Sequence, residues 1–169
     1  MEASKFQLIA LVLTICAVVF RLIGLASPYW ISFDIIISKV NSGLWKTCAK
    51  IILTGDTECS DVIVTDDDWL KAVRAMSILG LLVLVVAAIM TVLKLFVLKD
   101  MKPILFVAIG TAFAGAVFIL ISVAVYAAKV NDLYDYVDFD YHFAFAFSII
   151  GMIAAIGAGV VMVVEITKG

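Results

Sequence analysis

Four long apolar stretches dominate the pattern of hydrophobic and polar positions along the chain. A membrane-spanning helix needs about 20 mostly apolar residues, and four segments reach that length. We expect spanning helices at about residues 6–27, 72–93, 103–128 and 143–164. The third begins with Pro103, at a helical position where a missing N–H costs nothing. The pattern predicts a membrane protein, mainly α-helical, with one four-helix bundle formed by residues 1–169.

The first apolar stretch is longer than the core of a cleaved signal peptide. Such a core has about 7–15 apolar residues and ends at small residues. Gly24, Ala26 and Ser27 would suit cleavage, but the apolar run before them exceeds that length. We expect this stretch to be retained as a span.

The connection between the first two spans has a pattern typical of β-strands. Residues 44–53 and 58–65 are rich in β-branched and apolar residues, and the turn sequence Thr54-Gly55-Asp56-Thr57 lies between them. A further β-like run, residues 29–38, precedes the turn sequence Asn41-Ser42-Gly43. We predict a small antiparallel β-sheet of three or four strands.

The cysteines indicate how this sheet is stabilised. Cys48 and Cys59 flank the hairpin turn, so two strands joined there would place the thiols opposite each other. A disulfide between them requires an oxidising compartment and would contribute about 2–3 kcal/mol. Cys16 lies inside the first span without a thiol partner in reach. We expect it to pack as an apolar residue, or to be acylated if it lies near the inner face.

The charged residues predict the orientation of the chain. Lysines are found in the short connection after the second span and near both ends: Lys5, Lys94, Lys99, Lys102 and Lys168. By the positive-inside rule these segments are cytoplasmic. Most acidic residues, and two of the three cysteines, fall in the other two connections. We expect extracellular loops at residues 28–71 and 129–142, a cytoplasmic loop at 94–102, and both termini inside.

Composition excludes several classes of protein. Hydrophobic residues make up 65% and charged residues 15% of the chain, against about 25% charged in an ordinary soluble domain. Lipid is the solvent that accepts such a surface. A net charge of −2 and a single His do not favour a nucleic-acid partner or imidazole chemistry. Without a nucleophile–base pair, a metal cluster or a phosphate loop, the sequence predicts neither an enzyme nor a cofactor or metal.

A spaced pattern in the first loop resembles a known family. Trp30, Gly43-Leu44-Trp45, Cys48 and Cys59 resemble the W–GLW–C–C signature of the claudin superfamily, which includes the peripheral myelin protein and epithelial membrane protein branch. Arg74, within residues 70–75, lies where the family carries an Arg in a similar setting. Residues 139–147 are similar to the aromatic start of the last span in the myelin-protein branch. The resemblance covers nearly the whole chain.

Other features place the chain nearer to the short-loop, tail-less branch of this superfamily. The gap between Trp30 and Gly43 is shorter than in typical claudins, and the chain ends shortly after the last span without a PDZ-binding tail. The chain has no Asn-x-Ser/Thr sequon, so the N-glycan common in the myelin-protein branch is not expected.

The resemblance implies that the signature residues fold the loop. We expect Trp30 and Trp45 to pack the sheet onto the mouth of the bundle, as interfacial Trp residues do. We expect Gly43 to supply a turn with positive φ, and Arg74 to be structural, as in the family.

Arg21 lies inside the first span, about 10 Å from the outer boundary at the helical rise. We expect its charge to reach the lipid headgroups or a loop Tyr or Asp, although an intramembrane charge also suggests a functional site.

The second loop is rich in acids and aromatics. Its candidate contact or cation-attracting residues are Asp132, Tyr134, Asp135, Tyr136, Asp138 and Asp140. Tyr-rich exposed surfaces bind partners well, but an aromatic belt with solvated acids explains the same composition, and both interpretations stay open. His142 is given no role.

Asp66, Asp67 and Asp68 lack the spacing of a calcium loop. They are expected to favour the N-terminus of the helix that begins near Trp69.

Small residues recur four positions apart in the last two spans: Gly110 with Ala114, Ala112 with Ala116, and Ala155 with both Gly151 and Gly159. Such spacing lets helices approach closely, within a bundle or between copies.

The function hypotheses follow from the resemblance. The first is a claudin-like adhesion protein of cell–cell contacts in the plasma membrane, which associates with itself and forms or regulates a paracellular barrier or pore. The alternative is a regulatory or trafficking partner of other membrane proteins, such as channels, integrins or receptors. An independent channel or transporter is disfavoured, because the sequence lacks repeats, broken helices and a mid-membrane acid pair.

Overall fold

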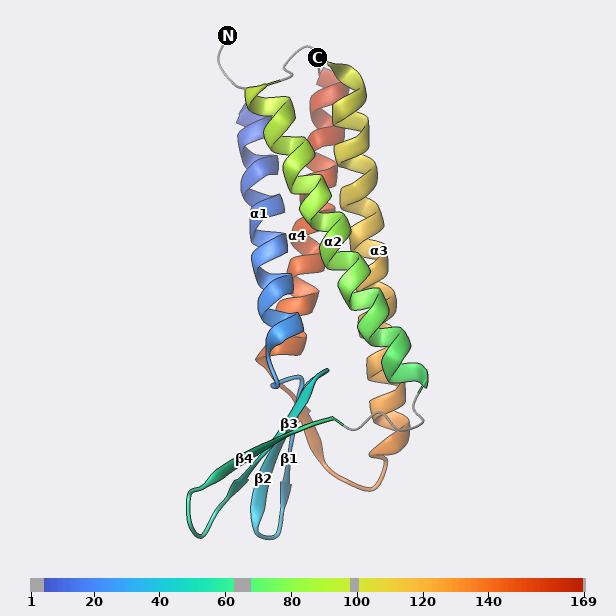
Figure 1. Ribbon diagram of the computed structural model, residues 1–169. Coiled ribbons are helices and arrows are strands. Elements are labelled where there is room, and N and C mark those ends of the chain that lie inside the picture. The colour runs from blue at the N-terminus through green and yellow to red at the C-terminus, as the bar shows by residue number, and fades with distance from the viewer. Residues whose placement is uncertain (1–4, 63–67, 98–100, 169) are drawn as a thin grey trace.

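The computed structural model is a bundle of four long helices with a β-sheet at one end (Figure 1). It describes residues 5–62, 68–97 and 101–168. The helices are α1 (Lys5–Ala26), α2 (Asp68–Phe96), α3 (Lys102–Leu133) and α4 (Phe143–Lys168). All four are long and apolar enough to cross a membrane. The predicted four-helix membrane fold is therefore confirmed.

Small residues allow the helices to pack closely in two pairs, α1 with α4 and α2 with α3 (Figure 1). A Cβ added at Gly151 of α4 would lie 3.1 Å from the carbonyl oxygen of Ala17 in α1. A Cβ at Gly115 of α3 would lie 2.7 Å from a methyl carbon of Leu84 in α2. Ala112, Ala116, Ala155 and Gly159 are buried in the same way, whereas Gly110 is exposed and a Cβ there would meet nothing within 4 Å.

The sheet has five antiparallel strands in the order β4-β3-β2-β1-β5. Its strands are β1 (Ile31–Ile35), β2 (Ser38–Ser42), β3 (Lys46–Ile51), β4 (Thr57–Asp61) and β5 (Phe139–Tyr141). The first loop supplies four strands, as predicted. The fifth comes from the second loop, where the sequence had suggested no strand. The two loops therefore form one sheet rather than two separate structures.

The predicted turn at Asn41-Ser42-Gly43 is wrong for Asn41 and Ser42, and only Gly43 lies in the link between β2 and β3. The first hairpin turns at Ile36 and Ile37, and Asn41 and Ser42 belong to β2, where Asn41 pairs with Cys48 and Ser42 with Thr47. Turn propensity yields here because β2 gains ladder hydrogen bonds on both sides. The second predicted turn is confirmed, and Gly55 in it has a φ of +76°.

Three helices are longer than the predicted spans, and one of them, α4, continues to Lys168. α2 begins at Asp68 and α3 continues to Leu133, so residues 129–133 are helical rather than part of a loop. Apolar content marks only the lipid-embedded part of a helix, whereas backbone hydrogen bonding continues beyond it. Val130, in this extension, is 2% exposed.

Of the three successive acids, only Asp68 is described. It is the first residue of α2 and forms an exposed ion pair with Lys71 at 3.1 Å. Asp66 and Asp67, like Lys99, lie outside the described residues.

The expectation for Arg21 is wrong. Its side chain is fully buried among the helices, and none of its guanidinium nitrogens has a hydrogen-bond partner among the described residues. A helical side chain tilts toward the N-terminus of its own helix. In α1 that direction leads away from the sheet and deeper into the bundle, so the side chain does not extend to the nearer surface.

Candidate functional site

The sheet is attached to the bundle through the C-terminal end of α1. The last carbonyls of a helix lack partners within it, and here the loop supplies them. The indole Nε1 of Trp30 donates to the Gly24 carbonyl at 2.6 Å, and that of Trp45 donates to the Leu25 carbonyl at 2.9 Å. The two Trp residues of the signature therefore cap the first helix.

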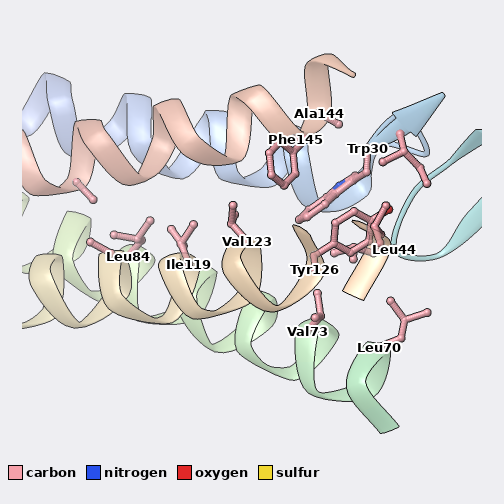
Figure 2. Close-up of a cluster of buried hydrophobic side chains, with 14 of the residues drawn as sticks. Trp30, Leu44, Leu70, Val73, Leu84, Ile119, Val123, Tyr126, Ala144 and Phe145 are labelled. Atoms are coloured by element: carbon pink, nitrogen blue, oxygen red, sulfur yellow. The ribbon is translucent and has the colours of Figure 1, made fainter. Parts of the chain in front are cut away.

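Trp30 also lies at the centre of an aromatic cluster. Figure 2 shows its ring between Tyr126 of α3 and Phe145 of α4, with ring centroids at 4.7 and 5.8 Å in edge-to-face arrangements. Trp30 and Leu44 are both completely buried. Truncating a buried Trp costs about 3–5 kcal/mol, so this cluster is a principal connection between the sheet and three helices.

Arg74 of α2 joins the same junction from the other side. Its Nε donates to the Leu44 carbonyl at 2.7 Å, and an Nη donates to the Val62 carbonyl at the longer distance of 3.5 Å. Its guanidinium carbon lies 4.9 Å from the centroid of the Trp45 ring, a cation–π contact. The structure thus brings Arg74 together with the adjacent residues Leu44 and Trp45, which lie about 30 positions earlier in the sequence.

The structure assigns Gly43 a different role from the expected positive φ, which it does not adopt. A Cβ at this position would lie 2.5 Å from the Cα of Pro28 and 2.6 Å from the carbonyl oxygen of Ser27. Main-chain atoms cannot move aside as a flexible side chain does. Glycine is required because the link between β2 and β3 crosses directly against the chain that leaves α1.

The disulfide between Cys48 and Cys59 is formed. The two residues pair directly across β3 and β4, with Cα atoms 4.0 Å apart. Cys48 is buried, whereas every residue of β4 is exposed. The bond therefore holds an otherwise solvated edge strand against the sheet.

The six candidate residues of the second loop do not form one surface. Asp132 is in the last turn of α3, and Tyr134 packs its ring against Phe33 and Phe139, with centroids at 5.3 and 6.0 Å. Asp135 is exposed, and Tyr136 is 97% exposed.

Three of these candidates, Tyr136, Asp138 and Asp140, line a groove together with residues of the first loop. The groove has a volume of about 690 Å³, and its lining includes four charged residues and one tyrosine: Asp34, Lys39, Tyr136, Asp138 and Asp140. We call these five residues the acidic groove. Because β5 pairs with β1, Asp140 lies opposite Ser32. Asp34 and Lys39, which face each other across β1 and β2, were not among the sequence candidates.

A second outer feature was not predicted from the sequence. Five aliphatic side chains are exposed at the ends of the two hairpins, and we call them the tip patch: Ile35, Ile36, Ile37, Ile52 and Leu53. Ile36 is 98% and Leu53 86% exposed. The Ile52 N–H donates to the Ile37 carbonyl at 3.0 Å, so the two hairpin ends are joined. Three successive isoleucines could have indicated it, since alternate strand residues cannot all face the core.

The remaining polar residues singled out in the sequence lie among packed side chains. The His142 ring lies near those of Tyr29 and Phe143, with centroids at 5.3 and 5.0 Å, and its backbone N–H donates to the Trp30 carbonyl. Cys16 is a free, partly buried thiol. Within the described part of the chain, no group of three His, Cys, Asp or Glu residues could hold a metal ion.

The comparisons with known proteins agree with this architecture. Residues 4–163 match the description of the PMP-22/EMP/MP20/Claudin family. No curated protein matches the sequence. The match covers α1 to α3, all five strands and most of α4, and this is a family of structural membrane proteins rather than enzymes. The chain therefore belongs to the PMP-22/EMP/MP20/Claudin family, as a four-helix membrane protein with a disulfide-stabilised antiparallel sheet.

Proposed function

We propose that this protein is an adhesive component of cell–cell contacts, which restricts or selects solutes between cells through its sheet. The tip patch is the observation that carries this proposal. Contiguous exposed apolar surface on a protein marks a site of interaction. Here such surface lies on paired hairpin ends that point away from the bundle (Figure 1).

The proposed orientation places the sheet outside the cell and the opposite end of the bundle in the cytoplasm of a plasma-membrane protein. Two observations support it. The disulfide requires an oxidising compartment, and Lys5, Lys94, Lys102 and Lys168 all lie near the end of the bundle opposite the sheet. In this orientation the tip patch faces a neighbouring cell, and the sides of the sheet face copies in the same membrane.

Cell aggregation tests the proposal. Cells that do not adhere to one another would express the wild-type chain or the double variant Ile36→Asn, Leu53→Asn, each at matched surface level. We expect the wild type to aggregate the cells and the double variant to lose most of this activity, because two largely exposed aliphatic contacts are replaced by hydrated amides.

Lys46→Asn is the matched control, since Lys46 is exposed but lies at the opposite end of β3 from the tip patch. It should aggregate cells like the wild type. Equal aggregation by the tip double variant would contradict adhesion through the tip patch.

The alternative role, regulation or trafficking of other membrane proteins, is supported by the buried Arg21 guanidinium, which has no hydrogen-bond partner in the described part of the chain. Localisation separates the two roles. Confinement of a tagged chain to lateral cell–cell borders supports adhesion. An even distribution over the plasma membrane or vesicles, with co-purifying channels or integrins, supports regulation.

A further inference from the structure

Arg21 is a buried charge with no counterpart among the residues that the structure describes. It lies five residues before the end of α1 and is completely inaccessible. Its Nε and both Nη atoms are buried and lack a hydrogen-bond partner among the described residues. Buried guanidinium groups are normally paired with carboxylates, so the missing partner requires an explanation.

The described helices hold no suitable carboxylate. Their three acids, Asp68, Asp132 and Glu165, lie at helix ends. Asp68 is exposed and paired with Lys71, and Asp132 is exposed. Glu165 lies near the end opposite the sheet and accepts a hydrogen bond from Gln7.

Three serine hydroxyls buried among the helices already have partners. The hydroxyls of Ser77 and Ser122 bond to each other at 2.6 Å, and that of Ser148 donates to the Ala144 carbonyl of its own helix. An uncharged side chain of similar volume would therefore make the isolated bundle more stable, as replacing buried charges by apolar residues often does. The guanidinium does not serve the stability of the isolated bundle.

We propose that Arg21 binds a carboxylate carried by a transmembrane helix of a partner membrane protein. The depth of the residue selects this ligand. Arg21 lies about 7.5 Å below the sheet-side end of α1 at the helical rise, and its side chain tilts farther from that end. A lipid phosphate or a dissolved anion at the surface lies too far away. An Asp or Glu on a hydrophobic helix at the same depth could form a two-pronged pair that is strong in a medium of low dielectric constant.

The packing of the helices indicates where such a partner would approach. Of the adjacent helix pairs, α1 and α2 share the smallest contact. In Figure 1 these two helices are close at the end away from the sheet and diverge toward it, and Arg21 belongs to the diverging half. A partner helix would lie against this half and displace the side chains that cover the buried guanidinium.

Designed peptides test the proposal with the full, disulfide-bonded chain in phosphatidylcholine vesicles. The probe is a poly-leucine spanning peptide with one Asp at the depth of Arg21, and its reference carries Asn at that position. Binding is measured by energy transfer between labels. We expect the wild type to bind the Asp peptide at least about tenfold more tightly than the Asn peptide, which corresponds to 1.4 kcal/mol.

Variants of the chain assign this preference to Arg21. Arg21→Met should abolish it, Arg21→Lys should retain part of it, and Lys71→Met, which removes one exposed positive charge, should leave it unchanged. Equal binding of both peptides by the wild type would overturn the proposal. So would an undiminished preference in Arg21→Met.

If Arg21→Met failed to form the Cys48–Cys59 disulfide, binding of the two peptides to the wild type would still decide whether the proposal holds.

A separate experiment replaces part of the lipid with phosphatidylglycerol. Enrichment of this lipid around the wild type but not around Arg21→Lys or Arg21→Met would assign the site to a lipid phosphate and overturn the protein partner. The test is independent of adhesion through the tip patch, so either proposal can fail alone.

Discussion

At the scale of single residues, three side chains donate to main-chain carbonyls at the junction of helices and sheet. Trp30, Trp45 and Arg74 bond to the carbonyls of Gly24, Leu25 and Leu44. A buried acceptor left without a partner costs about 1–3 kcal/mol, whereas one that water can reach costs less. The burial of each donor therefore decides how much each bond contributes.

Replacement of each Trp by Phe tests this ranking. Trp30→Phe should lower the free energy of unfolding by about 2–4 kcal/mol, because it leaves the Gly24 carbonyl unpaired in a buried site and opens a cavity. Trp45→Phe should cost about 1 kcal/mol, because Trp45 is 37% exposed and water can replace the indole. Denaturant unfolding in micelles, followed by fluorescence of the remaining Trp residues, measures both.

Trp69→Phe is the control, since the indole of Trp69 donates no hydrogen bond to any of the described residues. Its ring centroid lies 6.2 Å from that of Tyr126. A loss for Trp45→Phe as large as for Trp30→Phe would contradict the ranking by burial.

At the scale of elements, α3 and α4 share a small-residue spacing but use it on different faces. Gly151 of α4 lies against the backbone of α1, next to Ala17. Gly110 of α3 faces outward, with open space around it. Spacing alone does not separate the two cases, because it reports the period of a face and not what that face meets.

Leucine substitutions distinguish these faces. Gly151→Leu should destabilise the bundle by about 1–3 kcal/mol, the cost expected from overpacking against a rigid backbone. Gly110→Leu should change the free energy of unfolding by no more than about 0.5 kcal/mol. Thermal unfolding in micelles measures the two variants side by side, and equal losses would show that the outward face of α3 is also packed.

At the scale of the whole molecule, the two loops act as one outer unit. Pairing of β5 with β1 places Asp138 and Asp140 beside Asp34 around the acidic groove. Acids that line a concave surface raise the local concentration of cations more than scattered acids do. Asp132 and Asp135 have the same charge but lie outside this groove.

The position of the acids therefore predicts a difference in selectivity, if copies of the chain form a paracellular path. Asp138→Asn with Asp140→Asn should lower the preference for Na⁺ over Cl⁻ in a transepithelial dilution potential. Asp132→Asn with Asp135→Asn removes the same charge and should have a smaller effect. Unchanged selectivity in the first pair would exclude the groove as part of a conducting path.

Features encoded over short stretches could be predicted from the sequence. The four helices followed from apolar length, and the hairpin with its disulfide followed from Thr54-Gly55-Asp56 between Cys48 and Cys59. The signature residues could be named, and so could the expectation that Trp30 and Trp45 lie at the mouth of the bundle. Their hydrogen-bond partners could not be named, because carbonyls of Gly24 and Leu25 carry no distinguishing sequence signal.

The sequence by itself determined that the chain lies in a membrane, how many helices span it and where the disulfide-bonded hairpin forms. Each of these depends on local hydrophobicity or on turn chemistry. Only the tertiary structure decided that Phe139–Tyr141 form a fifth strand. It also decided that Gly43 is needed where the backbone passes close to Pro28, and that Arg21 points into the bundle. Each of these depends on which distant backbone or helix face lies opposite. That arrangement arises from packing among segments far apart in the chain.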